Sequence, residues 1–158
     1  MKILFLHGWH SSPGGRKPTF LAESGHQVAN PALCPDDFEK ACGAAQAAFD
    51  QQQPEVVVGS SRGGAIAMNI GRRGVPLVLM CPAWKHWGKV AVVSDPVSIL
   101  HSRGDEVIPF EDSVELVRLS GLPADRLIET GVEHRLASDQ ALQDMANACE
   151  RLRAGRPE

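Results

Sequence analysis

The 158-residue sequence contains no tyrosine, and its other aromatic residues are three tryptophans and five phenylalanines. Aromatic residues this few and this scattered do not form a platform on which nucleic-acid bases stack. The net charge is also small, −3 at pH 7 with histidine neutral. A chain without a basic excess is not drawn to nucleic acid or to an anionic membrane by its overall charge. We therefore expect partners that are neither nucleic acid nor membrane.

Cysteine is scarce, and the four cysteines follow no pattern typical of a metal site. They form no CxxC pair and no zinc-ligand spacing, and they stand at Cys34, Cys42, Cys81 and Cys149. We interpret them as reduced thiols rather than a disulfide framework. The first apolar run, residues 3–6, is far too short for a signal sequence or a membrane span. The sequence therefore predicts a cytoplasmic protein, with no metal and no organic cofactor.

Long hydrophobic runs are absent as well, and short apolar runs alternate with segments of helical pattern. The apolar runs lie at 2–6, 55–58, 76–80, 97–102 and 125–129, with a weaker run at 26–30. The helical patterns lie at 19–24, 36–53, 63–73, 111–120 and 136–152. This alternation predicts a parallel sheet covered by helices on both faces. We expect an α/β three-layer sandwich with a mostly parallel sheet of five or six strands. It forms one domain over residues 1–153, followed by a frayed tail over 154–158.

A serine, an aspartate and a histidine, the residue types of a nucleophile with its acid and base, each follow one of these apolar runs. They stand in the order Ser61, Asp105, His134. Ligands of an open α/β sheet bind beyond the carboxyl ends of its strands. Since parallel strands end at the same edge, we expect these three side chains to lie close together. A serine hydroxyl becomes a useful nucleophile when a histidine removes its proton and an acid orients that histidine. The sequence therefore points to acyl transfer at this edge.

Ser61 stands in a G-x-S-x-G pentapeptide, Gly59 to Gly63, between an apolar run and a helical pattern. Glycines on either side let a nucleophile occupy a sharp, strained turn, where side chains would collide with the neighbouring strand or helix. The alternative is that Ser60 or Ser61 only caps the helix. The pentapeptide alone does not decide between the two interpretations.

His134 is the best candidate for the base, because a loop between the last strand and the last helix can carry its imidazole to Ser61. Asp105 is the candidate acid, which would fix the histidine tautomer through one ring nitrogen. Asp95 and Glu106 are the reserve candidates for the acid. The alternatives are a solvated loop histidine and an aspartate that closes an Asx turn.

Two backbone N–H groups are expected to stabilise the negative charge that acyl transfer builds on a carbonyl oxygen. The residue after the nucleophile, Arg62, supplies one amide, and Trp9 in the turn after the first strand supplies the other. His10, Trp84 and Trp87 are candidates for the wall of the substrate pocket. The alternative for the two tryptophans, slightly favoured here, is that they cover the edge of the sheet.

Other polar residues near these motifs are given different roles. His7 closes the first strand in a structural role, and His101 is embedded at a strand end. Arg16 and Lys17 raise the question of a phosphate site, but their spacing does not match a Walker loop. We expect the Arg62 side chain to be solvated near the pocket mouth.

With these residues in place, the sequence resembles the α/β-hydrolase superfamily, in particular its small, lidless, bacterial esterase-like members. The resemblance covers nearly the whole chain through "LHGW", "VVGSSRGG", "SRGDEVIP" and "EHRL". It implies Ser61 as nucleophile, Asp105 as acid, His134 as base, and the Trp9 and Arg62 amides as oxyanion donors. The family's full sheet has eight strands, whereas this chain has five or six. Residues 81–96 are too few to hold a helical cap.

We therefore predict a serine hydrolase of carboxylesterase type that cleaves small esters or thioesters, as a monomer or homodimer. The same machinery would serve an amidase or a C–C hydrolase. The alternative from another class is a non-catalytic α/β-hydrolase-like domain that binds a ligand or a partner protein, since a fold does not fix a function.

Overall fold

A computed structural model describes residues 1–155, and six of its segments form one sheet. The strand order is β2-β1-β3-β4-β5-β6, and every neighbouring pair is parallel. The expected parallel sheet is confirmed, with six strands. Their bounds are β1 Lys2–Leu6, β2 Gln27–Ala29, β3 Val56–Ser60, β4 Leu77–Met80, β5 Val97–His101 and β6 Leu127–Glu129.

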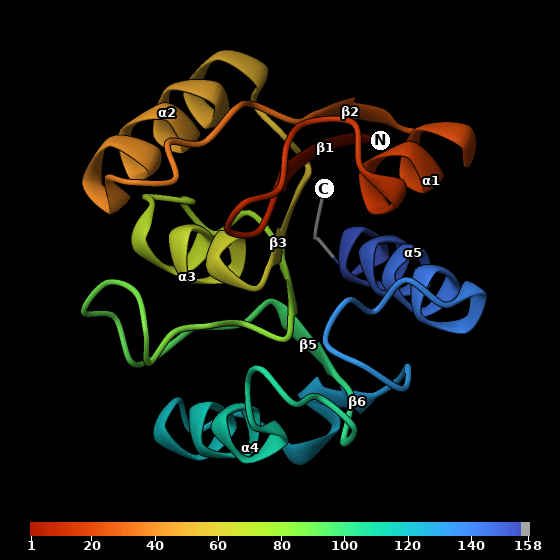
Figure 1. Ribbon diagram of the computed structural model, residues 1–158. Helices are drawn as coiled ribbons and strands as arrows, with labels where there is room; N and C mark the ends of the chain where they lie inside the picture. Colours follow the sequence, from red (N-terminus) through yellow and green to blue (C-terminus); the bar gives the residue numbers. More distant parts are fainter. Residues whose placement is uncertain (156–158) are drawn as a thin grey trace.

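Helices cover both faces of this sheet, which confirms the three-layer α/β sandwich. Figure 1 shows α2, α3 and α4 on one side of the strands and α1 and α5 on the other. The bounds are α1 Arg16–Glu23, α2 Phe38–Gln52, α3 Arg62–Asn69, α4 Phe110–Leu119 and α5 Asp139–Ala154, with a 3₁₀ turn η1 at Ala124–Arg126.

The strands are apolar on both faces because each face meets a helical layer. In β1, Leu4 and Leu6 pack in the cluster that includes α2, α3 and α4, whereas Ile3 and Phe5 pack in the cluster that includes α1 and α5. All four side chains are buried. This alternation explains why the strands could be recognised as short, continuous apolar runs.

Helix α1 begins at Arg16, three residues before the expected start. Pro18 lies in its first turn, where proline is tolerated because no intrahelical partner exists for its missing N–H. Helix α3 ends at Asn69 rather than near 73. The Asn69 side chain donates to the Ala65 carbonyl, and Ile70 turns to an extended conformation with its side chain buried.

The last two elements also differ from the expected bounds. Strand β6 begins at Leu127, because the preceding residues form η1. Helix α5 begins at Asp139, where the Ser138 side chain accepts from the Ala141 amide. The helix continues to Ala154, inside the segment expected to be frayed, and residues 156–158 of that segment lie outside the described part.

Residues 81–96, between β4 and β5, contain neither a helix nor a strand. The carboxyl ends of the strands therefore have no helical cap at this connection, as expected. Within residues 1–155, no helix is both long enough and apolar enough to cross a membrane.

Candidate active site

Ser61 occupies a strained backbone conformation between β3 and α3. Its φ of 55° and ψ of −117° lie in a region that side-chain-bearing residues rarely adopt. The Ser61 amide donates to the Met80 carbonyl at the end of β4, at 2.9 Å, and its carbonyl accepts from Gly64 and Ala83. These bonds hold the turn that presents the hydroxyl beyond the end of the strand.

The glycines of the pentapeptide are required by close backbone contacts. A Cβ built on Gly59 would lie 2.5 Å from the Gly63 carbonyl oxygen. A Cβ built on Gly63 would overlap the Leu6 carbonyl oxygen of β1. The turn therefore packs α3 against β1 and β3 more closely than any side chain at 59 or 63 allows.

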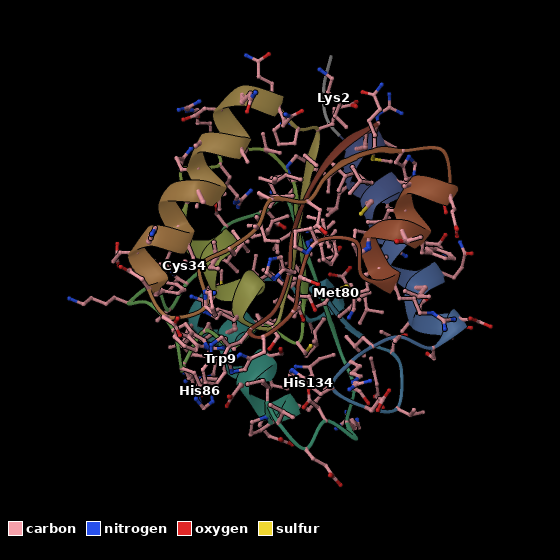
Figure 2. The ribbon with its side chains drawn as sticks, turned by 45° about the horizontal axis from the view of Figure 1, so that its top comes forward. Lys2, Trp9, Cys34, Met80, His86 and His134 are labelled. Carbon is pink, nitrogen blue, oxygen red and sulfur yellow. The ribbon has the colours of Figure 1, made fainter. Side chains whose placement is uncertain are left out.

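The structure brings the three predicted side chains into one hydrogen-bonded chain. His134 Nε2 lies 3.0 Å from Ser61 Oγ, and His134 Nδ1 lies 2.7 Å from Asp105 Oδ2. Because Nδ1 faces a carboxylate it carries the proton, which leaves Nε2 to accept from the serine hydroxyl. Figure 2 shows His134 and Trp9 toward one end of the molecule, opposite Lys2 at the start of β1.

The Asp105 side chain is fully buried, and four hydrogen bonds reach it. Burial opposes ionisation, but bonds from His134 and from the Ile108 and Val107 amides outweigh it and lower the pKa of Asp105 below its ordinary value. The carboxylate is therefore charged at neutral pH. The reserve acids lie elsewhere, because Asp95 pairs with Arg126 at 2.8 Å and Glu106 is exposed.

His101 is a second histidine on the same carboxylate, a role that sequence reasoning did not assign. Its Nε2 lies 3.0 Å from Asp105 Oδ2 and 3.0 Å from the Ile108 carbonyl, and its Nδ1 lies 2.7 Å from Ser113 Oγ. Facing two acceptors, Nε2 carries a hydrogen. Complete burial lowers the pKa of His101, although Asp105 acts in the opposite direction. His101 therefore stays neutral and orients Asp105.

We expect His101→Gln to flatten the dependence of stability on pH. The unfolded chain takes up a proton on His101 near its ordinary pKa of 6.5, and the folded protein does so only at lower pH. The free energy of unfolding therefore falls as the pH drops below 6.5, by at most about 1.4 kcal/mol per pH unit. Urea unfolding between pH 7 and pH 5 measures this slope. His86→Gln, at an exposed position, should keep the wild-type slope. An unchanged slope in His101→Gln would contradict the assignment.

The two amides expected to bind an oxyanion are close to the turn. Neither the Trp9 N–H nor the Arg62 N–H donates a hydrogen bond within residues 1–155. An added Cβ at Gly8 would lie 3.5 Å from Ser61 Cβ, so the turn after β1 runs in contact with Ser61. That spacing is ordinary contact, and glycine is not sterically required at position 8. The two amides are available for an oxygen beside Ser61.

The Arg62 side chain is buried, so the expectation of a solvated guanidinium is wrong. It is 1% exposed, donates to the Cys34 carbonyl at 2.7 Å, and lies 4.8 Å from the ring centre of Trp87. Phe38 lies on the same guanidinium, at 5.7 Å. Cation–π contacts and one hydrogen bond thus offset part of its desolvation. The side chain ties the start of α3 to the segment before α2.

A pocket of about 790 Å³ opens in front of Ser61 and His134. His10, Trp9 and Val107 lie in its wall. The remaining wall comes mainly from the loop after β1, the first turn of α1 and residues 135 and 137.

The structure corrects the placement of two residues expected in the pocket wall. Within the described residues, neither Trp84 nor Trp87 lines this pocket. Trp84 is buried in the core beside α4 and donates through Nε1 to the Asp112 carbonyl. Trp87 packs edge-on against Trp9, behind the pocket wall. Both tryptophans pack against other side chains of the protein, which is nearer to the favoured interpretation that they cover the edge of the sheet.

Residues 2–92 match the model of an uncharacterised protein family, UPF0227. The chain belongs to this family. No curated protein matches the sequence. Solved structures match over almost the full chain and show the α/β-hydrolase fold.

Three of these structures illustrate the match. A protein of the α/β hydrolase superfamily from Xanthomonas campestris is 22% identical, with 98% of each chain covered and a TM-score of 0.75. Alpha/beta hydrolase domain-containing protein 10 from mouse is 16% identical, with 96% of this chain and 88% of that chain covered and a TM-score of 0.77. The esterase domain of a Rhodothermus marinus protein is 18% identical, with 97% and 84% covered and a TM-score of 0.66.

The UPF0227 match covers only part of the candidate site. It includes the turn after β1 and the Ser61 pentapeptide, but Asp105 and His134 lie beyond residue 92. These two side chains lie in the loops after β5 and β6. Because all strands are parallel, these loops lie at the same sheet edge as Ser61.

One cluster in this UPF0227 chain has the residue types of a metal site. Ligand atoms of Cys81, Asp105 and His134 lie within 4.8 Å of one another, the one such group among the described residues. Burial raises the pKa of the Cys81 thiol to about 12, and its Sγ donates to the His134 carbonyl. Asp105 and His134 already bind each other. A protonated thiol and a paired imidazole are poor metal donors, so the cluster does not fit a metal.

Proposed function

We propose that this protein is a serine hydrolase that cleaves small carboxylic esters or thioesters. The observation that carries the proposal is the unbroken chain of hydrogen bonds from Asp105 through His134 to Ser61, on a strained turn at the mouth of a pocket. A serine with this base and this acid within hydrogen-bond reach is equipped for nucleophilic catalysis. The esterase domain among the proteins of the same fold supports the choice of ester chemistry.

The proposed reaction has two halves. Ser61 Oγ attacks the substrate carbonyl while His134 Nε2 takes the hydroxyl proton, and the tetrahedral oxyanion lies against the Trp9 and Arg62 amides. His134 then gives its proton to the leaving alcohol or thiol, and the acyl group stays on Ser61. In the second half, His134 takes a proton from water, which attacks the acyl carbon. The bond from that carbon to Ser61 Oγ then breaks, His134 returns the proton to Oγ, and the acid is released. Asp105 stabilises the imidazolium in both halves.

Covalent labelling tests this proposal directly. We expect a fluorophosphonate to form one adduct, on Ser61, because His134 activates that hydroxyl. Peptide mass spectrometry locates the adduct, and p-nitrophenyl butyrate hydrolysis is measured in parallel. Ser61→Ala should lose both the adduct and the turnover. Ser24→Ala, at an exposed position after α1, should keep both.

The contrary results are equally specific. An adduct on Ser60 instead of Ser61 would contradict the assignment of the nucleophile. A folded protein with no adduct and only background turnover would favour a non-catalytic binding domain. The proposal also includes a cytoplasmic location, which is supported by four free cysteines.

A further inference from the structure

The pocket in front of Ser61 is lined by positive charge. Three basic side chains are in its wall, Arg16, Lys17 and Arg135, and His10 adds an imidazole. Among the described residues that line it, none is an aspartate or a glutamate. The whole chain carries a net charge of −3, so this concentration does not follow from a basic composition. The sign of the charge is specific to the pocket.

Two of these cations have no anionic partner in the protein. Arg16 pairs with Asp139, at 2.7 Å from Nη2 to Oδ1. Within residues 1–155, Lys17 and Arg135 form no ion pair and no side-chain hydrogen bond. Unpaired like charges at one pocket repel each other, and an anionic ligand would remove that repulsion.

The burial of Lys17 supports the same conclusion. Burial lowers the pKa of its ammonium group, and the positive charge of Arg135 lowers it further. Cys81 and Glu133 act in the opposite direction without forming a bond to it. A half-buried ammonium without a partner loses hydration, and a bound anion would supply the missing partner.

The rest of the wall is suited to an apolar group. Trp9 is 51% exposed and Val107 is 62% exposed, and both side chains line the pocket. Large apolar side chains left open at a site favour contact with an apolar part of a ligand. The wall therefore combines an apolar part with two free cations.

We propose that the substrate carries an anionic group, a carboxylate or a phosphate, which Lys17 and Arg135 bind while its ester or thioester carbonyl lies at Ser61. This inference rests on the proposed hydrolase function and names its substrate class. The apolar part of the substrate contacts Trp9 and Val107. The anionic group belongs either to the acyl part or to the leaving group, and two pairs of substrates distinguish these sources.

Each pair has one anionic and one neutral member with the same reacting carbonyl. In the first pair, the p-nitrophenyl monoester of adipic acid carries the charge on its acyl part, and its methyl ester is neutral. In the second pair, butyryl-coenzyme A carries the charge on its leaving group, and butyryl-N-acetylcysteamine is neutral. We expect wild type to prefer the anionic member of at least one pair by about tenfold or more in kcat/KM, the effect of two partly exposed ion pairs.

The double variant Lys17→Met, Arg135→Gln should remove this preference. The anionic substrate should lose about tenfold in kcat/KM, and the neutral substrate should change less than about twofold. The matched control is Lys89→Met, Arg118→Gln, which removes the same charge at exposed positions outside the pocket wall. Equal rates for both members of both pairs in wild type, or equal losses in the double variant, would overturn the inference.

A binding measurement separates this inference from the proposed function. In Ser61→Ala protein, calorimetry compares monomethyl adipate with dimethyl adipate, and butyryl-coenzyme A with its neutral counterpart. Tighter binding of an anionic ligand, weakened about tenfold by the Lys17 and Arg135 substitutions, supports the anionic class even when wild type hydrolyses nothing. Hydrolysis by Ser61 with no charge preference in binding or turnover refutes the anionic class alone.

Discussion

Asp105→Asn is expected to lower kcat for p-nitrophenyl butyrate by about 10³–10⁴-fold, while the protein stays folded. Asp105 accepts hydrogen bonds from His134, His101 and two backbone amides, all of which require an acceptor. The asparagine amide loses the charge that stabilises the imidazolium and can turn an NH₂ group toward His134 Nδ1. The imidazole would then present the wrong tautomer to Ser61.

The reserve acids provide the controls for this variant. Asp95→Asn and Glu106→Gln should keep kcat within about twofold of wild type, because Asp95 is bound to Arg126 and Glu106 is exposed. Near-normal turnover in Asp105→Asn, together with a large loss in either control, would move the acid role away from Asp105. Far-ultraviolet circular dichroism verifies that each variant is folded.

Gly63→Ala is expected to lower the free energy of unfolding by about 3 kcal/mol or more, or to prevent folding. The new methyl group would occupy the space of the Leu6 carbonyl oxygen, which is part of the β1 backbone and cannot turn away as a side chain can. Separation of α3 from β1 would also displace Ser61 from His134. The free energy of unfolding, measured in urea, and the rate of ester hydrolysis should therefore fall together.

Gly43→Ala is the matched control for this substitution. Gly43 lies within α2, and a Cβ built on it has no neighbour within 4 Å. Alanine in a helix interior is better than glycine by about 1 kcal/mol, so this variant should be more stable than wild type. A Gly63→Ala protein as stable as Gly43→Ala would show that the strained turn at Ser61 tolerates a side chain at position 63.

The strands and the three residues Ser61, Asp105 and His134 could be placed from sequence for one physical reason. A strand buried on both faces is a short, unbroken apolar run, and the parallel order forces all carboxyl ends to one edge. Function-bearing residues therefore stand in the turns and loops that follow recognisable runs. This arrangement predicts which side chains meet at the edge, and no measured distance is needed for that prediction.

Side-chain packing was not predictable in the same way. Arg62 follows Ser61 in the chain, but only the folded structure shows that Phe38 and Trp87 lie against its guanidinium. The contact between His101 and Asp105 has a weak signal, a histidine at a strand end four residues before an aspartate. That signal does not specify which way either side chain points.

Helix ends depend on local bonds that composition does not determine. The end of α3 is fixed by the Asn69 side chain on the Ala65 carbonyl and by the burial of Ile70. The start of α1 could have been found, since proline in the first turn is a recognised signal. Trp84 and Trp87 could not be assigned to the pocket wall or to packing from the sequence, because a surface tryptophan and a core tryptophan look alike in a sequence.

The assembly of the candidate site spans almost the whole length of the chain. The turn after β1 lies near the start, whereas His134 lies in the loop before α5, the last helix. Strands β5 and β6 must pair, and α5 must pack on β4 and β5, before that loop has a fixed position. During synthesis, which proceeds from the N-terminus, Ser61 emerges long before its base. Reactivity of Ser61 toward a fluorophosphonate would thus report the completion of folding, and a growing chain would remain inert until its last helix is made.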